Sequence, residues 1–179
     1  SSIQNEPLTL MGAGLVFTCL DARKMIAKRE FSVYTEKNIE GEIIMLAEIA
    51  KMYYLEKGAN CSEAIVKAAN DAYKLGLDEK AIKLISGFGG GCGCGILCGA
   101  VAGALSIVSL LSVGEGGAHA TEGFGPLCGG LVEEIKEKLS STDCKDIKPQ
   151  MVQPEVRCVR TVEIAAEVLE AYLKEHGKV

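Results

Sequence analysis

The stretch SGFGGGCGCGILCGAVAG, residues 86–103, decides the fold. It sets Cys92, Cys94 and Cys98 in glycine-rich backbone and continues into an uncharged apolar segment, Ala100 to Val113. Such a segment is typical of a buried helix. Three thiols carried by a loop at the start of a helix indicate metal or redox chemistry. The rest of the chain must then supply the remaining ligands.

Composition predicts one globular domain with an ordinary core, because the 179 residues are 48% apolar. The net charge of −5 and the lack of tryptophan argue against a nucleic-acid partner, which needs clustered basic residues or stacking aromatics. The apolar patches Leu8 to Leu20 and Ala100 to Val113 are both shorter than the ~20 residues of a membrane span. We therefore expect a soluble protein without a membrane span.

Eight cysteines in a chain of this size indicate either disulfides or thiol chemistry. The disulfide interpretation is weak because the chain is not small and is rich in helix-forming apolar residues. No basic segment precedes the patch at Leu8, and the first basic residue is Arg23, so a secretory leader is not expected. A reducing cytoplasm is favoured over the periplasm, and clustered cysteines there point to metal or catalysis.

Helical periodicity and capping residues predict an all-α fold, a single-domain helical bundle with a glycine-rich cysteine loop. Asn60 with Glu63 forms a capping box, Asp78 is an N-cap, and Pro126 suits a first turn. Thr142 or Asp143 is expected to cap a short turn around Cys144. The predicted helices are 40–57, 61–75, 79–85, 100–113, 127–139 and 155–175. Residues 1–39 are expected to form an arm that contacts a second subunit, and residues 40–179 the cysteine-rich domain.

Five cysteines from distant parts of the chain fall at predicted helix N-termini. The positive end of the helix dipole and its free N–H groups favour the thiolate, the form that ligates metal or attacks disulfides. Inert cysteines would instead scatter through helix interiors. These five are Cys61, Cys98, Cys128, Cys144 and Cys158.

The order of Cys61, then CGAVAG from Cys98 to Gly103, then Cys144 and Cys158 resembles the family of redox-active proteins known by its C-GCAxxG-C-C pattern. The flanking sequences NCSEA at 60–64, SGFGGG at 86–91 and LVEEI at 131–135 resemble the family as well. The resemblance covers residues 43–173. It is specific, because four cysteines, a glycine run and the CGAxxG motif must occur in order.

The same segment is similar to the iron–sulfur domain of split-Soret cytochrome c, a helical homodimer. That resemblance implies an iron–sulfur cluster, [2Fe–2S] first and [4Fe–4S] or a second cluster as alternatives, with Cys61, Cys98, Cys144 and Cys158 as metal ligands. It also implies a homodimer. The chain has no Cys-x-x-Cys-His motif, so covalent haem is not expected.

Three further cysteines depart from the family pattern. Cys92 and Cys94 stand where many members have Met and a basic residue, and Cys128 is extra. The spacing Cys-x-Cys-x3-Cys matches neither zinc ribbons nor the usual ferredoxin runs. Extra metal ligation and a redox-labile disulfide both stay open, whereas Cys19, in an apolar run, is expected to pack.

Glycine backbone can approach a cluster closely and direct N–H groups at it. The cofactor-binding positions expected on this ground are Gly91, Gly93, Gly95 and Gly99. Gly103, one turn after Gly99, is expected to let another helix approach. No part of the run gives G-x-G-x-x-G or a P-loop, which excludes a nucleotide site of those kinds.

The remaining candidates for site chemistry are few. His119 is expected in a solvated loop, as a minor ligand candidate, and His176 in the exposed tail. No catalytic triad or set of histidines and carboxylates is recognisable.

The leading hypothesis is an iron–sulfur electron-transfer protein with an unknown redox partner, and not a substrate-transforming enzyme. The alternatives are a metal-free thiol–disulfide oxidoreductase or redox sensor using Cys92, Cys94 and Cys98, and a zinc-stabilised structural module.

Overall fold

The computed structural model describes residues 45–179. Within this range the secondary structure is helical, and the only β-type pairing consists of two isolated bridges, which confirms the predicted all-α helical bundle. The predicted arm, Cys19 and the start of the helix expected at residue 40 lie outside the described residues. The α-helices are α2 (Leu46–Leu55), α3 (Cys61–Tyr73), α4 (Glu79–Ile85), α5 (Gly99–Ser112), α6 (Phe124–Leu139), α7 (Cys144–Met151) and α8 (Val159–Glu175).

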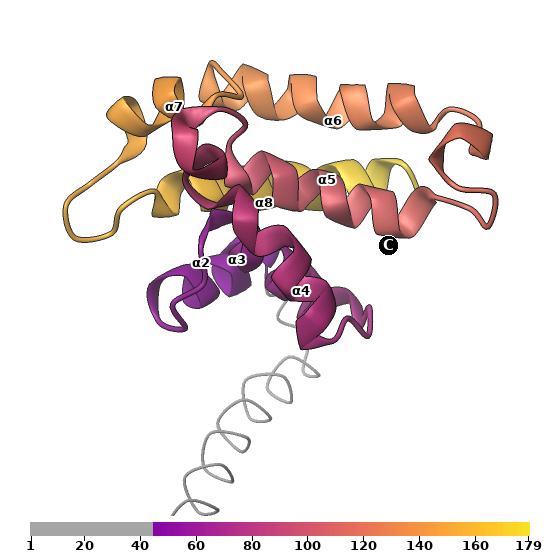
Figure 1. Ribbon diagram of the computed structural model, residues 1–179, viewed down its shortest axis with the longest axis horizontal. Helices are drawn as coiled ribbons and strands as arrows, with labels where there is room; N and C mark the ends of the chain where they lie inside the picture. Colours follow the sequence, from indigo (N-terminus) through magenta and orange to yellow (C-terminus); the bar gives the residue numbers. More distant parts are fainter. Residues whose placement is uncertain (1–44) are drawn as a thin grey trace, which may run out of the picture. The chain divides into compact units, whose positions relative to one another are not determined.

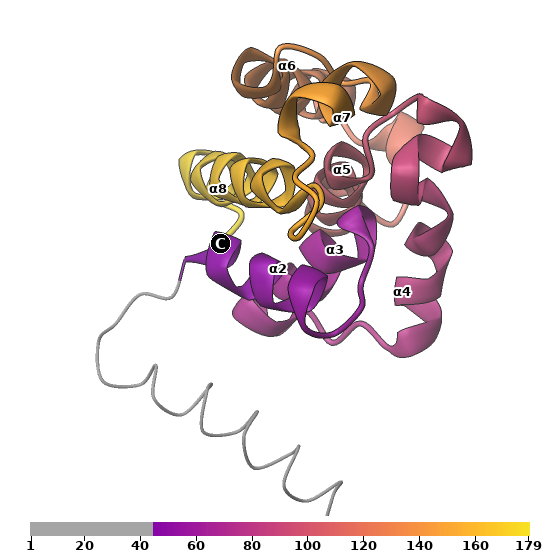
Figure 2. The same ribbon diagram turned by 90° about the vertical axis from the view of Figure 1, so that its left-hand side faces the viewer.

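Helix α5 lies at the centre of the bundle, between α3 and α4 on one side and α6 and α8 on the other (Figures 1 and 2). Its first six residues are all buried, which explains why this segment carries no charge. A Cβ at Gly103 would lie 2.7 Å from the Ser62 carbonyl oxygen of α3. Glycine thus lets α3 and α5 approach closely, as predicted.

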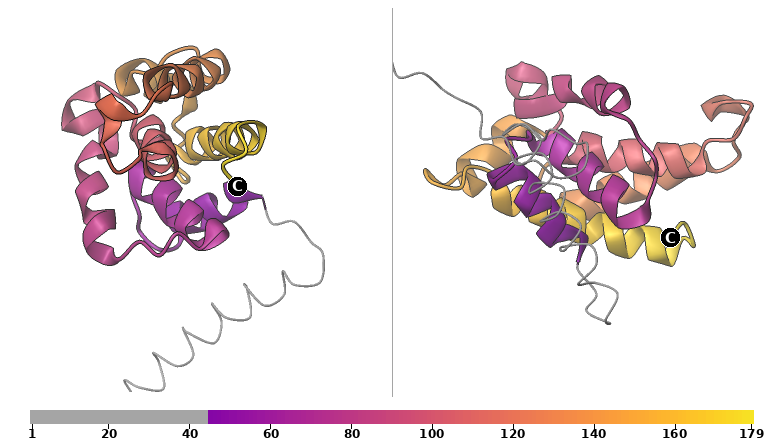
Figure 3. Two further views of the ribbon diagram at one scale, coloured as in Figure 1. Left: turned by 90° about the vertical axis from the view of Figure 1, so that its right-hand side faces the viewer. Right: turned by 90° about the horizontal axis from the view of Figure 1, so that it is seen from below.

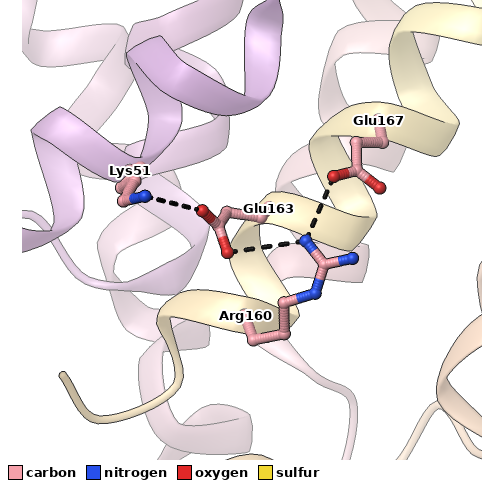
Figure 4. Close-up of polar contacts among 4 residues, drawn as sticks. All are labelled: Lys51, Arg160, Glu163 and Glu167. Carbon is pink, nitrogen blue, oxygen red and sulfur yellow. Dashed lines mark hydrogen bonds and ion pairs between the residues drawn. The ribbon is translucent and has the colours of Figure 1, made fainter.

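Helices α2 and α8 are also joined by charged side chains at their surface (Figure 4). Lys51 on α2 lies 3.1 Å from the Glu163 carboxylate on α8. Arg160 lies between Glu163 and Glu167, at 3.5 and 3.1 Å. Because these pairs are exposed to water on at least one side, their contribution is small, and the apolar faces carry most of the packing energy.

Two of the three predicted N-caps are confirmed, whereas Asp143, at the N-cap position of α7, makes no capping hydrogen bond with its side chain, and the short turn expected around Cys144 is an eight-residue helix. The Asn60 side chain accepts the N–H groups of Ser62 and Glu63, and the Glu63 carboxylate accepts the Asn60 N–H at 2.9 Å, which completes the capping box. The Asp78 carboxylate accepts the Ala81 N–H at 2.8 Å at the start of α4. These contacts are local in sequence, so the residue types alone specify them.

Two predicted boundaries were wrong, and both corrections concern cysteines. Helix α6 begins at Phe124 rather than residue 127, so Cys128 lies inside the helix and not at its N-terminus. Helix α8 begins at Val159 rather than residue 155, because Gln153 and Arg157 exchange two backbone hydrogen bonds of 2.9 and 2.7 Å and close a turn there. Cys158 therefore occupies the N-cap position of α8.

The loop 113–123 joins α5 to α6 at the end of the bundle away from α7 (Figures 1 and 3). His119 lies on this loop and is exposed, as predicted. Among residues 45–179, no helix is both long and apolar enough to cross a membrane.

Candidate metal centre

Backbone pairing joins the segments that carry Cys98 and Cys144. The Cys98 N–H donates to the Thr142 carbonyl oxygen at 2.7 Å, and the Cys144 N–H donates to the Ile96 carbonyl oxygen at 2.8 Å. These two bonds flank an antiparallel bridge. Both cysteines are buried, with 3% and 9% of their surface exposed. The pairing therefore sets the start of α5 beside the start of α7.

Cys61 reaches the same region through the close packing of α3 on α5. Cys61 is the first residue of α3, and a Cβ added at Gly99 would lie 3.2 Å from the Cys61 Cβ. The same added atom would lie 2.9 Å from the Phe88 carbonyl oxygen. Because Gly99 directly follows Cys98, this contact places Cys61 next to the start of α5.

Cys158 is the fourth cysteine of this group and is anchored by Tyr54 of α2. Its N–H donates to the Tyr54 hydroxyl at 3.2 Å. The neighbouring Arg157 donates from Nη2 to the Tyr54 carbonyl oxygen at 2.9 Å, and its guanidinium lies 4.6 Å from the centre of the Tyr54 ring. The C-terminal end of α2 therefore fixes the start of α8.

The thiols of these four cysteines act electrostatically on one another, which shows that they share one neighbourhood. The pKa of Cys61 is raised to about 12, chiefly by burial and in addition by the charges of Cys98, Cys158 and Cys144. Burial also raises the pKa of Cys98 and of Cys158, and Cys144 adds to each shift. We call Cys61, Cys98, Cys144 and Cys158 the cysteine cluster.

Several groups oppose these shifts. The backbone N–H groups of Ala100 and Val101, in the first turn of α5, lower the pKa of Cys98. The Tyr54 hydroxyl lowers the pKa of Cys61 and Cys158, and the charges of Lys148 and Arg157 lower that of Cys158.

The expectation that helix N-termini favour the thiolate is thus wrong for Cys61, Cys98 and Cys158 in the metal-free chain. Burial and the mutual repulsion of the cysteine cluster outweigh the dipole and the donors. A bound cation would reverse this balance, because a coordinating thiol is deprotonated.

Within residues 45–179, no three or more His, Cys, Asp or Glu side chains are grouped tightly enough to hold one metal ion. The candidate site is not a compact single-ion site but consists of four thiols that the starts of four helices bring to one region. This donor set fits an iron–sulfur cluster, since four cysteine thiolates are its usual ligands and N–H groups bond its sulfurs.

The glycine turn, Gly91–Gly95, packs against the start of α7. A Cβ at Gly91 would lie 2.5 Å from the Cys144 Cβ, and one at Gly95 would lie 3.1 Å from the Lys145 Cβ. Nothing lies within 4 Å of the corresponding position at Gly93. Gly91 and Gly99 therefore lie against Cys144 and Cys61, and Gly95 lies against Lys145, while the binding of a cofactor by these glycines stays a prediction.

Cys92 and Cys94 lie on the glycine turn, and Cys94 is the more exposed of the two. Cys94 is exposed and Cys92 is half-buried, with a left-handed backbone at φ 59°. The Cys94 Sγ lies 3.6 Å from the Gly91 carbonyl oxygen, which it faces as a donor. All seven cysteines of the described range are free thiols, so the structure contains no disulfide in the turn.

Cys128 lies elsewhere in the bundle. It packs against the core from α6, and its charge acts on Tyr172. Tyr172 lies about 20 Å along α8 from Cys158 at 1.5 Å per residue, so Cys128 is not brought to the cysteine cluster. His176 is likewise at the far end of α8, where its Nδ1 lies 2.9 Å from the Tyr172 carbonyl oxygen.

The sequence analysis missed Tyr54, Arg157 and Thr142 as parts of the site. Tyr54 lies at apolar helical spacing in the segment 40–57, and nothing in that spacing distinguishes it from Tyr53. Arg157 was recognisable only as the charged neighbour of Cys158. Thr142 contributes its backbone carbonyl, which any residue type carries, so only the tertiary pairing reveals it.

An all-α bundle that gathers cysteines from the starts of four helices defines a class of cysteine-rich, redox-active protein. The chain belongs to the family whose model is described as "Putative redox-active protein (C_GCAxxG_C_C)", which matches residues 59–172. An uncharacterized protein of Archaeoglobus fulgidus is 27% identical over 134 residues, covering 68% of this chain and 89% of the relative. No solved structure matches the chain significantly.

Proposed function

We propose that the protein binds an iron–sulfur cluster through Cys61, Cys98, Cys144 and Cys158 and transfers electrons. The observation that carries the proposal is the convergence of these four thiols from four helix starts far apart in the chain. A cluster held there supplies one-electron transfer, and [2Fe–2S] is the type we propose. The residues of the chain contribute the thiolates, the donors at Cys98 and the apolar surroundings.

Burial supports an outer-sphere electron-transfer role. Cys98 and Cys144 are almost fully buried, so an organic substrate has little access to a group bound between them. The charges of Lys148 and Arg157 favour negative charge at Cys158. Both features suit a buried, anionic cluster, since burial and hydrogen bonds to sulfur set its potential.

Anaerobic reconstitution with iron and sulfide tests the proposal. We expect stoichiometric iron and acid-labile sulfide, visible absorption bands, and an electron paramagnetic resonance signal after one-electron reduction. A colourless preparation that cannot be reconstituted contradicts it. Stoichiometric zinc without a chromophore supports the structural zinc module instead, and reversible thiol counts without metal support the thiol–disulfide oxidoreductase.

We also propose that the protein is a homodimer and that Cys92, Cys94 and Cys128 are not ligands of this cluster. Sedimentation equilibrium of the full chain measures the first proposal, with a twofold mass expected. A triple Ser variant of the three cysteines tests the second and is expected to bind the same amount of iron as the wild type. Loss of iron in that variant contradicts it.

A further inference from the structure

Tyr54 is the one aromatic side chain that contacts the cysteine cluster through a polar atom in the described part of the chain. It ends α2 and is 4% exposed. Its hydroxyl oxygen accepts the Cys158 N–H at 3.2 Å. The guanidinium of Arg157 lies over its ring, and the same side chain donates to its carbonyl oxygen at 2.9 Å. Both ends of the residue are therefore held in place.

The fixed hydroxyl still has a proton to donate. A phenolic oxygen accepts and donates, and the Cys158 N–H already occupies one acceptor position. The bond from the Cys158 N–H places the hydroxyl beside the cysteine cluster, and the hydroxyl lowers the pKa of Cys61 and Cys158, the direction expected when its O–H faces their sulfurs. One O–H serves one sulfur at a time, so it donates to whichever carries more negative charge.

Neighbouring Tyr53 provides the contrast. Its hydroxyl donates to the Asp71 carboxylate, and Asp71 belongs to α3. No cysteine is among the groups that act on the pKa of Tyr53. Two adjacent tyrosines thus have the same chemistry, but only Tyr54 directs its hydroxyl to the cysteine cluster.

Arg157 shows that this arrangement is held at a conformational cost. Its φ of 53° is left-handed, a backbone conformation that is strained for a non-glycine residue. The turn is closed by two backbone hydrogen bonds between Gln153 and Arg157. The stacking of Arg157 on the Tyr54 ring and its hydrogen bond to the Tyr54 carbonyl oxygen offset this strain. They also hold the neighbouring Cys158 next to the Tyr54 hydroxyl.

We propose that Tyr54 is a positioning residue whose hydroxyl donates a hydrogen bond to a cysteine sulfur of the bound iron–sulfur cluster and raises its reduction potential. The inference rests on the proposed function. A donor to sulfur stabilises negative charge, and the reduced cluster carries one electron more than the oxidised one. Removing the donor must therefore make the addition of that electron less favourable.

The test compares Tyr54→Phe with the matched control Tyr53→Phe, both reconstituted anaerobically in the full chain and titrated with dithionite under spectroelectrochemical control. We expect Tyr54→Phe to have a lower midpoint potential, with the ratio of reduced to oxidised cluster falling about tenfold at the wild-type midpoint. Tyr53→Phe is expected to keep the wild-type midpoint. In deuterated buffer, pulsed electron paramagnetic resonance of the reduced cluster should lose one exchangeable deuteron coupling in Tyr54→Phe only.

A second measurement uses the metal-free protein. The Cys158 amide is expected to exchange with solvent about tenfold faster in Tyr54→Phe, because its acceptor is removed, and at the wild-type rate in Tyr53→Phe. A wild-type chain that assembles no cluster overturns the proposed function and this inference together. A cluster that assembles in Tyr54→Phe with an unchanged midpoint potential overturns the inference alone. Faster exchange of the Cys158 amide together with an unchanged midpoint potential would show that Tyr54 has a structural role only.

Discussion

Cys98 and the pair Cys92 and Cys94 are close neighbours in sequence but lie in opposite environments. Cys98 is 3% exposed, its N–H donates to the Thr142 carbonyl oxygen, and the N–H groups of Ala100 and Val101 lower its pKa. Cys94 is exposed on the glycine turn, and Cys92 has a left-handed backbone. This difference shows that a cysteine belongs to the site when its segment pairs with a distant segment, and that nearness to another site cysteine in the sequence is not enough.

The largest expected effect is on metal binding. Cys98→Ser is expected to abolish the binding of iron and sulfide, because it removes a buried ligand, whereas Cys94→Ser is expected to bind as much as the wild type. Iron and sulfide per chain after anaerobic reconstitution measure both, with thermal unfolding of each metal-free variant as the control for folding. An equal loss of iron and sulfide in the two variants would contradict this difference and would make the glycine turn part of the metal site.

The next effect concerns the glycines of the turn. Gly91→Ala is expected to destabilise the protein by about 3 kcal/mol or more, because a Cβ there combines a positive φ with a clash against Cys144. Gly93→Ala carries the positive φ alone and is expected to cost about 1–2 kcal/mol. Urea unfolding of the metal-free proteins measures both free energies. Equal costs would show that the turn does not pack on α7.

A smaller difference in the free energy of unfolding is expected between substitutions at two N-cap residues. Asn60→Ala removes two accepted N–H bonds and a bond to the Ser86 carbonyl oxygen, so a loss of about 1–2 kcal/mol is expected. Asp78→Ala removes one exposed cap and is expected to cost about 0.5–1 kcal/mol. Urea unfolding again gives the values. Only Asn60→Ala should also weaken iron binding, since Asn60 positions Cys61, and unchanged binding in that variant argues against this role.

The smallest expected effect is the dependence of the protein's stability on pH in the alkaline range. The Cys61 thiol has a raised pKa of about 12 in the folded chain, chiefly through burial, against an ordinary value of 9.0. The unfolded chain therefore releases this proton first, and the free energy of unfolding of the metal-free protein should fall as pH rises above 9. Cys61→Ser is expected to flatten the profile measured by urea unfolding between pH 8 and 10. A profile as steep as that of the wild type would contradict the burial of this thiol.

The helices were predictable because their signals are local. The Asn60 and Asp78 caps, the uncharged run of α5 and the glycines at its start all act within a few residues, and the structure confirms them. The start of α8 was not predictable, because a pair of hydrogen bonds between Gln153 and Arg157 competes with the helix for these residues. The sequence offers only Pro154, a residue favoured in the first turn of a helix, and this predicts a start at residue 155.

For the site, the sequence by itself determined which cysteines follow the family pattern, the class of fold and the small residues that α3 and α5 need to approach. The tertiary structure decided which thiols meet. The pairing of the Cys98 and Cys144 segments, the anchoring of Cys158 by Tyr54 and the distant position of Cys128 all depend on contacts between remote segments. The tertiary structure also decided the direction of the cysteine pKa shifts. Burial and the mutual repulsion of the four thiols arise only when the helices pack together, and both outweigh the effect of the helix dipole.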